Sequence, residues 1–175
     1  MNEDNTRKLI DKYEFLKRSL KTEEGQTMYS PFQMYLFELE DGWYNLLDST
    51  FGEMLNAAKH PDEIYVTQVK EKWAGLRLYF NCNSDDYDAL SFIVDQAELQ
   101  SYKICEICGK EGSVRDLIGY QTLCEQHYQE KQNYYRKLTE LMGRIDDSQI
   151  EAMRQDYYKR LTEEYRKPEK VDSDE

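Results

Sequence analysis

The residues best suited to chemistry in this 175-residue chain are two short pairs of metal-binding types. Cys105 and Cys108 form a C-x2-C unit followed by Gly109, and Cys124 and His127 form a C-x2-H unit after a further stretch of chain. Two thiolates three positions apart on a tight turn can face one cation, and the glycine relieves the bend. Four nitrogen and sulfur donors in a tetrahedron are typical of a closed structural zinc site. The spacing therefore predicts one structural Zn²⁺ per chain, with these four side chains as its ligands.

Other interpretations of the cysteines and histidines stay open at this point. A thioredoxin-like redox pair opens a helix after a strand, whereas a glycine and a polar loop follow Cys108. Cys82 is typical of a small buried hydrophobe, although it offers a replacement for His127 as a ligand. His60 has no activating neighbour in the sequence and is interpreted as a loop residue. Disulfides are not expected, because the N-terminus MNEDNTRKLI lacks an apolar export signal.

The chain between the two ligand pairs predicts their geometry. Residues 109–123 place glycines between short apolar pieces, which is typical of a small hairpin. Cys124 then opens a long helix, whose dipole stabilises a thiolate. A knuckle, a hairpin and ligands at a helix start form the treble-clef arrangement. Such an ion has no open position for a catalytic water, and it contributes on the order of 10 kcal/mol to folding of its segment.

The hydrophobic periodicity predicts a mostly helical α+β fold around this motif. One helix is expected from about residue 5 to residue 20, and a third over residues 43–59. Between them, Ser30 and Gln33 form a capping box for a second helix. Its inner face is expected to hold Phe32, Leu36 and Leu39.

Residues 64–73 and 76–82 are rich in β-branched and aromatic types and predict a β-hairpin. Gly75 is available for a positive φ in its turn. Two strands alone are marginal in water, so the hairpin must pack on helices or pair with further strands. A helix is expected to follow, from Asn83 to about Tyr102.

The predicted organisation has four parts. A core of helices and a β-hairpin takes residues 1–104, and the zinc knuckle at 105–128 is integrated with it. Residues 129–167 form a C-terminal helical hairpin, whose second helix starts at a capping box of Ser148 and Glu151. Residues 168–175 are an acidic tail that is expected to be disordered.

The chain carries 23 basic and 35 acidic side chains, a formal net charge of −12. Such a charge repels nucleic acid unless a local basic patch is present. The segment 64–82 is the positive one, and its cationic and aromatic residues form a candidate site for phosphate, nucleic acid or an acidic partner. The candidate binding residues are Lys70, Lys72, Trp73, Arg77 and Tyr79. Alternatively, Trp73 packs the hairpin on a helix and the lysines pair with nearby carboxylates.

Composition excludes several classes of protein. A mean hydropathy of −0.91 and the lack of an apolar run of about 18 residues argue against a membrane protein. An aromatic content of 13% is too high for a disordered chain. With no export signal, the expected location is the cytoplasm. No GxSxG, P-loop, HExxH or dinucleotide fingerprint is present, so the chain is not predicted to be an enzyme.

Several motifs follow one another in a distinctive order: DGW at 41–43, QVKEKWAGLRLYF at 68–80, CEICG at 105–109 and LCEQH at 123–127. Over about residues 41–128, this order resembles an uncharacterised family of small bacterial and phage proteins. The resemblance implies a zinc site at the cysteines and the histidine, in a bacterial cell or a phage-infected host. It implies no particular reaction.

These observations predict a non-enzymatic, zinc-stabilised binding or regulatory protein that contacts a partner protein. The acidic segments 31–63 and 83–104 fit an inhibitor that imitates nucleic acid in a basic groove. The alternative is a nucleic-acid-binding zinc protein that uses the 64–82 hairpin. The tyrosines of the C-terminal helices leave room for a dimer, and the sequence does not set the oligomeric state.

Overall fold

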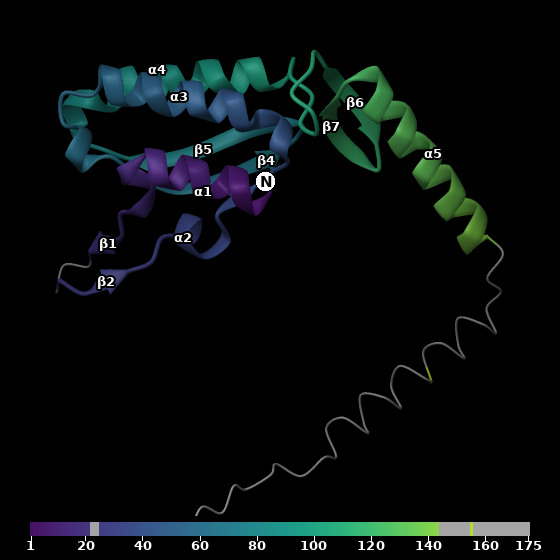
Figure 1. The fold of residues 1–175 in the computed structure, drawn as a ribbon, viewed down its shortest axis with the longest axis horizontal. Coiled ribbons are helices and arrows are strands. Elements are labelled where there is room, and N and C mark those ends of the chain that lie inside the picture. Colours follow the sequence, from purple (N-terminus) through teal and green to yellow (C-terminus); the bar gives the residue numbers. More distant parts are fainter. Residues whose placement is uncertain (22–24, 144–154, 156–175) are drawn as a thin grey trace, which may run out of the picture. The chain divides into compact units, whose positions relative to one another are not determined.

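The computed structural model describes residues 1–21, 25–143 and 155 of the chain (Figure 1). The chain divides into two units, residues 1–130 and residues 131–175. Its architecture is α+β and mostly helical, as the sequence predicts.

The first unit contains four α-helices and three small sheets in its described residues. The helices are α1 (Glu3–Lys12), α2 (Pro31–Tyr35), α3 (Tyr44–Ala57) and α4 (Ser84–Ser101), with 3-10 turns at Glu14–Lys17, Asp41–Trp43 and Pro61–Glu63. The strands are β1 (Leu20–Lys21), β2 (Thr27–Met28), β3 (Phe37–Glu38), β4 (Tyr65–Lys72), β5 (Gly75–Asn81), β6 (Ser113–Leu117) and β7 (Gly119–Leu123). Helix α5 (Glu125–Met142) begins in the first unit and continues into the second.

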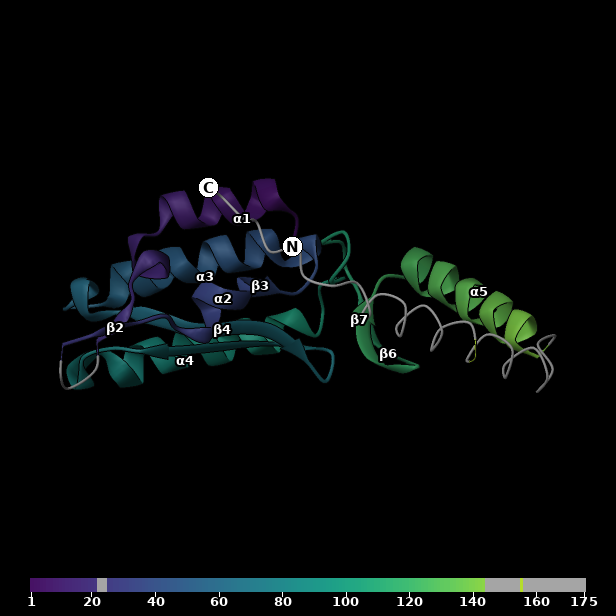
Figure 2. The ribbon, with the colours of Figure 1, turned by 90° about the horizontal axis from the view of Figure 1, so that it is seen from below.

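The main core lies where α3 and α4 pack on a three-stranded sheet in the order β3-β4-β5 (Figure 1). Helix α1 lies against α3 on its other side, as Figure 2 shows. Aromatic rings fill the space between these elements, and Trp43, Phe15, Phe32 and Phe51 are all fully buried. Burial of each such side chain stabilises the fold by about 1.5–3 kcal/mol.

The predicted N-terminal helix is shorter than its periodicity suggested. Helix α1 ends at Lys12, and Tyr13 adopts an extended conformation. Its hydroxyl donates a hydrogen bond of 2.6 Å to the carbonyl oxygen of Asp48. The following 3-10 turn then buries Phe15 as well, with its ring 5.7 Å from that of Tyr13. A continuous helix cannot place residues two positions apart on one face, so packing of both rings ends it.

The second predicted helix is also cut short. Its capping box is confirmed, since Ser30 accepts from the N–H of Gln33 and the Gln33 side chain accepts from Ser30. However, α2 ends at Tyr35, and Leu36 takes a left-handed conformation with φ 54° and is exposed instead of facing inward. Phe37 then enters β3 and pairs in parallel with Val69. No pattern of residue types predicts this third strand, which completes the sheet that the hairpin needed.

The later elements agree closely with the predictions. Helix α3 follows Trp43, and β4 pairs with β5 as an antiparallel hairpin. Asn83 caps α4 by accepting from the N–H of Asp85 at 3.0 Å. The predicted hairpin between the ligand pairs is present as β6 and β7.

The turn between β4 and β5 differs from the prediction, because other residues than Gly75 have the positive φ values. Trp73 and Ala74 have positive φ values of 56° and 66°, whereas Gly75 does not. Gly75 is needed for a different reason, because a Cβ there would lie 2.5 Å from the ring of Tyr102. A two-residue hairpin turn requires left-handed backbone at both central positions, which costs an L-residue about 1–2 kcal/mol.

This strain predicts the effect of Trp73→Asn on stability. Asparagine tolerates the left-handed conformation, and the indole is 66% exposed, so little burial is lost. We expect an unchanged or slightly higher Tm in thermal unfolding followed by circular dichroism. A clear fall in Tm would instead show that the indole holds the hairpin in place.

Asp86 joins the start of α4 to the loop after α3. Its buried carboxylate accepts hydrogen bonds of 2.8 Å from the backbone N–H groups of Lys59 and His60. The His60 ring nitrogen Nδ1 lies 3.2 Å from the same carboxylate. Burial alone would raise the pKa of Asp86, but these hydrogen bonds hold it below its usual value.

The lowered pKa predicts how Asp86→Asn changes stability with pH. The ionised carboxylate stabilises the fold fully above the ordinary aspartate pKa, and this stability is lost as the pH falls through the lowered pKa. Wild-type protein should therefore melt several degrees above the variant at neutral pH, and the difference should vanish in strong acid. Asp88→Asn, on an exposed position of α4, is the control. An equal gap at every pH would contradict this role.

The second helix of the predicted C-terminal hairpin, apart from Gln155, and the acidic tail lie outside the described residues. Among the helices that are described, none combines the length and the hydropathy needed to cross a bilayer.

Candidate metal centre

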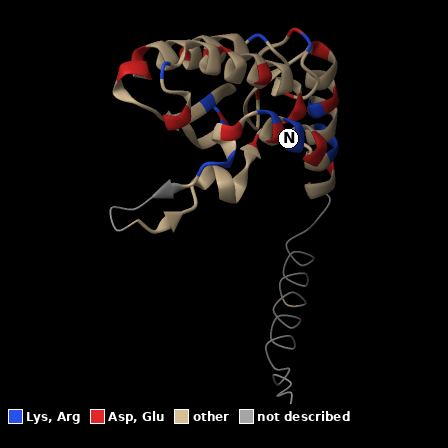
Figure 3. Cartoon of the chain, turned by 60° about the vertical axis from the view of Figure 1, so that its left-hand side comes forward, with Lys and Arg blue, Asp and Glu red and all other residues tan. Residues whose placement is uncertain are grey.

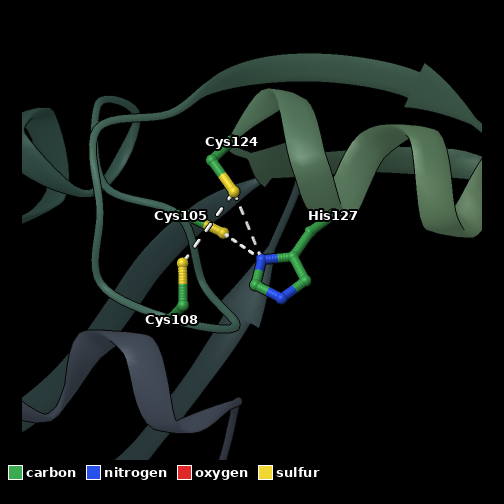
Figure 4. A group of neighbouring side chains, drawn as sticks. All are labelled: Cys105, Cys108, Cys124 and His127. Atoms are coloured by element: carbon green, nitrogen blue, oxygen red, sulfur yellow. Dashed lines mark hydrogen bonds between the residues drawn. The ribbon is translucent and has the colours of Figure 1, made fainter.

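Cys105, Cys108, Cys124 and His127 come together in the structure (Figure 4). Their donor atoms all lie within 4.8 Å of one another. The sulfurs of Cys108 and Cys124 are 3.8 Å apart. Nδ1 of His127 lies 3.2 Å from the sulfur of Cys124 and 3.4 Å from that of Cys105. The predicted residues therefore form one cluster of three sulfurs and one nitrogen that can hold a metal ion.

The local fold of the knuckle places its two cysteines. Gly109 has a φ of +74°, as its position after the C-x2-C unit predicts, and its N–H donates to the carbonyl oxygen of Cys105 at 2.8 Å. The N–H of Cys105 donates in turn to Lys110 at 2.7 Å. This tight turn aims both sulfurs at the same point. Cys124 and His127 reach that point from the start of α5.

Gly42 packs directly against the backbone of the knuckle. Its N–H donates to the carbonyl oxygen of Glu106 at 2.6 Å. A Cβ on Gly42 would clash with the backbone oxygens of Cys105 and Glu106, and a Cβ on Gly109 would lie 2.9 Å from the carbonyl oxygen of Gly42. The two backbones therefore meet where only glycine fits.

Further hydrogen bonds join the knuckle to the core and to both hairpins. The indole N–H of Trp43 donates to the carbonyl oxygen of Ile104 at 2.8 Å. The N–H of Glu106 donates to Thr122 in β7 at 2.9 Å. The buried hydroxyl of Thr122 then donates to the carbonyl oxygen of Ala74 at 2.8 Å. A chain of hydrogen bonds through Thr122 thus links the knuckle to the turn of the β4–β5 hairpin.

The environment of Cys124 favours a thiolate. The backbone N–H of His127 and the neighbouring thiols donate hydrogen bonds to its sulfur, which lowers the pKa of Cys124 to about 7. A thiol that ionises near neutral pH loses its proton readily when a metal ion binds to the sulfur.

His127 has a carboxylate near its second ring nitrogen. Nε2 lies 3.9 Å from a carboxylate oxygen of Glu130, one turn further along α5. A carboxylate at hydrogen-bond distance orients a metal-binding imidazole and makes it a better donor, but 3.9 Å is longer than a hydrogen bond. Glu130 was not among the predicted site residues, although a carboxylate three positions after a ligand on a helix is a recognisable signal.

The spare cysteine and histidine lie outside the cluster. Cys82 is not among the grouped donors, so the four-residue assignment needs no substitute for His127. Burial raises the pKa of the Cys82 thiol most, and the negative charges of Asp86 and Glu63 raise it further. Because the thiolate is the reactive form, a raised pKa opposes a role as a nucleophile. His60 is a loop residue, as expected, and its ring faces Asp86.

The register of the β4–β5 hairpin places Lys70 directly opposite Arg77, with Lys72 and Tyr79 on the same face of the hairpin. Arg77 forms an ion pair of 2.7 Å with Glu98 and donates to the hydroxyl of Tyr102 at 3.1 Å. Lys70 lies over the ring of Tyr79, 5.8 Å from its centroid. Lys72 and Trp73 are exposed near the turn. Arg77 therefore shares a hairpin face with Lys70, Lys72 and Tyr79, but its charge is already paired with Glu98 within the fold.

Acidic and basic side chains are interspersed over the described part of the chain, as Figure 3 shows. Several carboxylates of the acidic segments are paired within the fold. Asp48 binds Lys12 at 2.7 Å, and Asp62 lies 3.5 Å from Arg18. These acids stabilise the structure as well as contributing to the negative surface.

The fold and the cluster define a small α+β chain with four grouped side chains that can hold a metal ion. Comparison with family models, with curated proteins and with solved structures gives no match. The resemblance to the bacterial and phage family stays a prediction.

The ligand assignment predicts that Cys108→Ser lowers the bound metal below one ion per chain. Serine is a poor ligand for an ion held by sulfur, so affinity should fall by orders of magnitude. Elemental analysis of protein purified without chelator measures the stoichiometry. Cys82→Ser is the matched control and should keep a full complement. Equal metal in both variants would overturn the assignment.

Proposed function

We propose that this chain is a non-enzymatic binding protein whose interaction surface is held in shape by one structural zinc ion. The proposal is supported mainly by the position of the Cys105–His127 cluster, which is bonded to both hairpins through the knuckle.

The distances within the cluster favour zinc. A tetrahedral zinc ion with bonds of about 2.3 Å to sulfur and about 2.0 Å to nitrogen separates two sulfurs by about 3.8 Å, and sulfur from nitrogen by about 3.5 Å. The corresponding distances are 3.8 Å between Cys108 and Cys124, and 3.2 and 3.4 Å to His127. Three thiolates also select zinc over the hard cations calcium and magnesium.

A structural role fits this ligand set better than a catalytic one. All four tetrahedral positions are supplied by side chains, so no open position would remain for a reacting water. The spare histidine, His60, lies on the loop before η3 (Pro61–Glu63) and faces Asp86, away from the cluster residues. An enzyme would need a reacting group at the ion, and the histidine outside the ligand set is engaged with Asp86 instead.

The nucleic-acid alternative has less support in the geometry. It relied on Lys70, Lys72, Trp73 and Arg77 acting together, but Arg77 is paired with Glu98. Lys72 and Lys70 are then the remaining cations of that hairpin, and two charges give weak binding to phosphate at physiological salt. A protein partner is favoured for this reason. Several carboxylates of the acidic segments form ion pairs within the fold. The zinc-supported hairpins are therefore the surface that we propose for partner binding.

Zinc removal provides the test. Chelation should expose the backbone amides of β6 and β7 to hydrogen exchange, while α3 stays protected by the core. Chelation should also abolish binding of a partner protein that the zinc-loaded chain captures. Treatment with nuclease should leave that capture unchanged, because no nucleic acid bridges the two proteins. Equal binding by apoprotein, or capture that disappears with nuclease, would contradict the proposal.

A further inference from the structure

Exposed apolar side chains gather where the turn of the β4–β5 hairpin meets the β6–β7 hairpin. The ring of Trp73 lies 6.5 Å from that of Tyr120. Val114 pairs with Thr122 and therefore points to the same face of its hairpin as Tyr120, one diagonal step away. Ile118 lies in the turn at the tip of the same hairpin, and all four side chains are exposed. We refer to Trp73, Val114, Ile118 and Tyr120 as the hairpin surface.

The structure holds this surface rigidly. Ala74 follows Trp73 and Thr122 lies two positions after Tyr120, and these two buried residues are joined by a hydrogen bond. Trp73 itself keeps a left-handed backbone, which is unusual for a bulky side chain. Strained residues of this kind concentrate at binding sites, because the surroundings fix them where a ligand needs them. An exposed indole fixed in this way loses little freedom on binding.

The charge of this region differs from that of the whole chain. The chain has a net charge of −12. Residues 109–123 contain Lys110 and Arg115 against Glu111 and Asp116, which balance. Arg115 is already engaged by Glu125 at 2.9 Å and by the ring of Tyr128. The exposed charges next to the hairpin surface are Asp116, opposite Tyr120 in the register, and Lys72, beside Trp73. These two charges balance, so the surface is apolar without a net charge, which favours an uncharged partner over a polyanion.

Its size selects among apolar partners. The exposed parts of the four side chains amount to about 400 Å², enough to mark an interaction site. A stable homodimer buries about 800 Å² on each subunit, so a second copy on this surface alone would be held weakly. A short segment of another protein needs less area, and an aromatic pair is a typical anchor for it.

We propose that the hairpin surface binds a short, uncharged, apolar segment of a partner protein, with Trp73 and Tyr120 as the anchors. This inference rests on the proposed function and names the surface and the chemistry of the partner. Trp73 was a candidate in the sequence, but Val114, Ile118 and Tyr120 become recognisable only from the fold.

The test is selection from a library of random twelve-residue peptides displayed on phage, using zinc-loaded protein. Enriched peptides should be rich in aliphatic and aromatic residues and poor in charge. A synthetic copy of the best peptide should bind the Trp73→Ala and Tyr120→Ala variants at least tenfold more weakly. Phe92→Ala removes a ring that is 64% exposed on α4 and is the control that should bind normally.

The two tryptophans give a direct readout of where the peptide binds. Trp73 is exposed and Trp43 is fully buried, so iodide should quench the fluorescence of Trp73 selectively. A bound peptide should protect Trp73 from iodide. Failure to enrich any peptide, enrichment of charged peptides, or full affinity in Trp73→Ala would overturn the inference.

The outcomes also separate this inference from the proposed function. If a captured partner protein binds Trp73→Ala as well as wild type but requires zinc, the surface is wrong and the zinc-dependent binding function stands. If the peptide binds chelated protein equally well, the zinc-supported function is wrong. Sedimentation showing a dimer that Trp73→Ala dissolves would assign the surface to a second copy and overturn the inference.

Discussion

The organisation of the first unit depends on a simple distance constraint at the metal cluster. A tetrahedral site requires four donor atoms within about 4 Å of one another. The four donors already lie within 4.8 Å, which requires the knuckle and the start of α5 to be held together. The knuckle rests on Gly42, where the two backbones approach too closely for any side chain, and Trp43 fastens the chain just before it. Because Trp43 is also part of the main core, the metal site and the core share a boundary. Metal binding and folding of this boundary therefore stabilise each other.

Features encoded within a few residues could be predicted from the sequence. The ligand pairs have donors three positions apart, and Gly109 follows its pair with the positive φ that the knuckle needs. The capping box at Ser30 and the cap at Asn83 are similarly local. In each case the side chains that recognise one another lie within one turn, so the pattern survives whatever the rest of the chain does.

Features set by contacts distant in sequence could not be predicted in this way. Strand β3 forms because Phe37 packs 5.0 Å from Phe32 and pairs with β4, and nothing in two residues of sequence signals a strand. Gly75 was interpreted as the left-handed turn residue, yet the ring of Tyr102 requires a glycine there instead. Because Lys72 pairs with Gly75, Trp73 and Ala74 are the two residues of the turn and carry the strained backbone. A pattern of residue types shows that a glycine is needed but does not show which constraint it satisfies.

The strained turn and the metal cluster are linked through one short path. Ala74 accepts a hydrogen bond from Thr122, whose own carbonyl accepts from Glu106 inside the knuckle. An unfavourable conformation persists only where its surroundings determine it from several sides, and here the surroundings include the segment that the metal ion would order. Loss of the ion would release Thr122, and the turn would then be free to relax. The conformation of Trp73 is therefore coupled to the metal cluster through the hydrogen bonds of Ala74, Thr122 and Glu106. Trp73 itself is not one of the four predicted ligands. Under the proposed function, a zinc ion that binds no partner itself would in this way set the affinity of the apolar surface beside it.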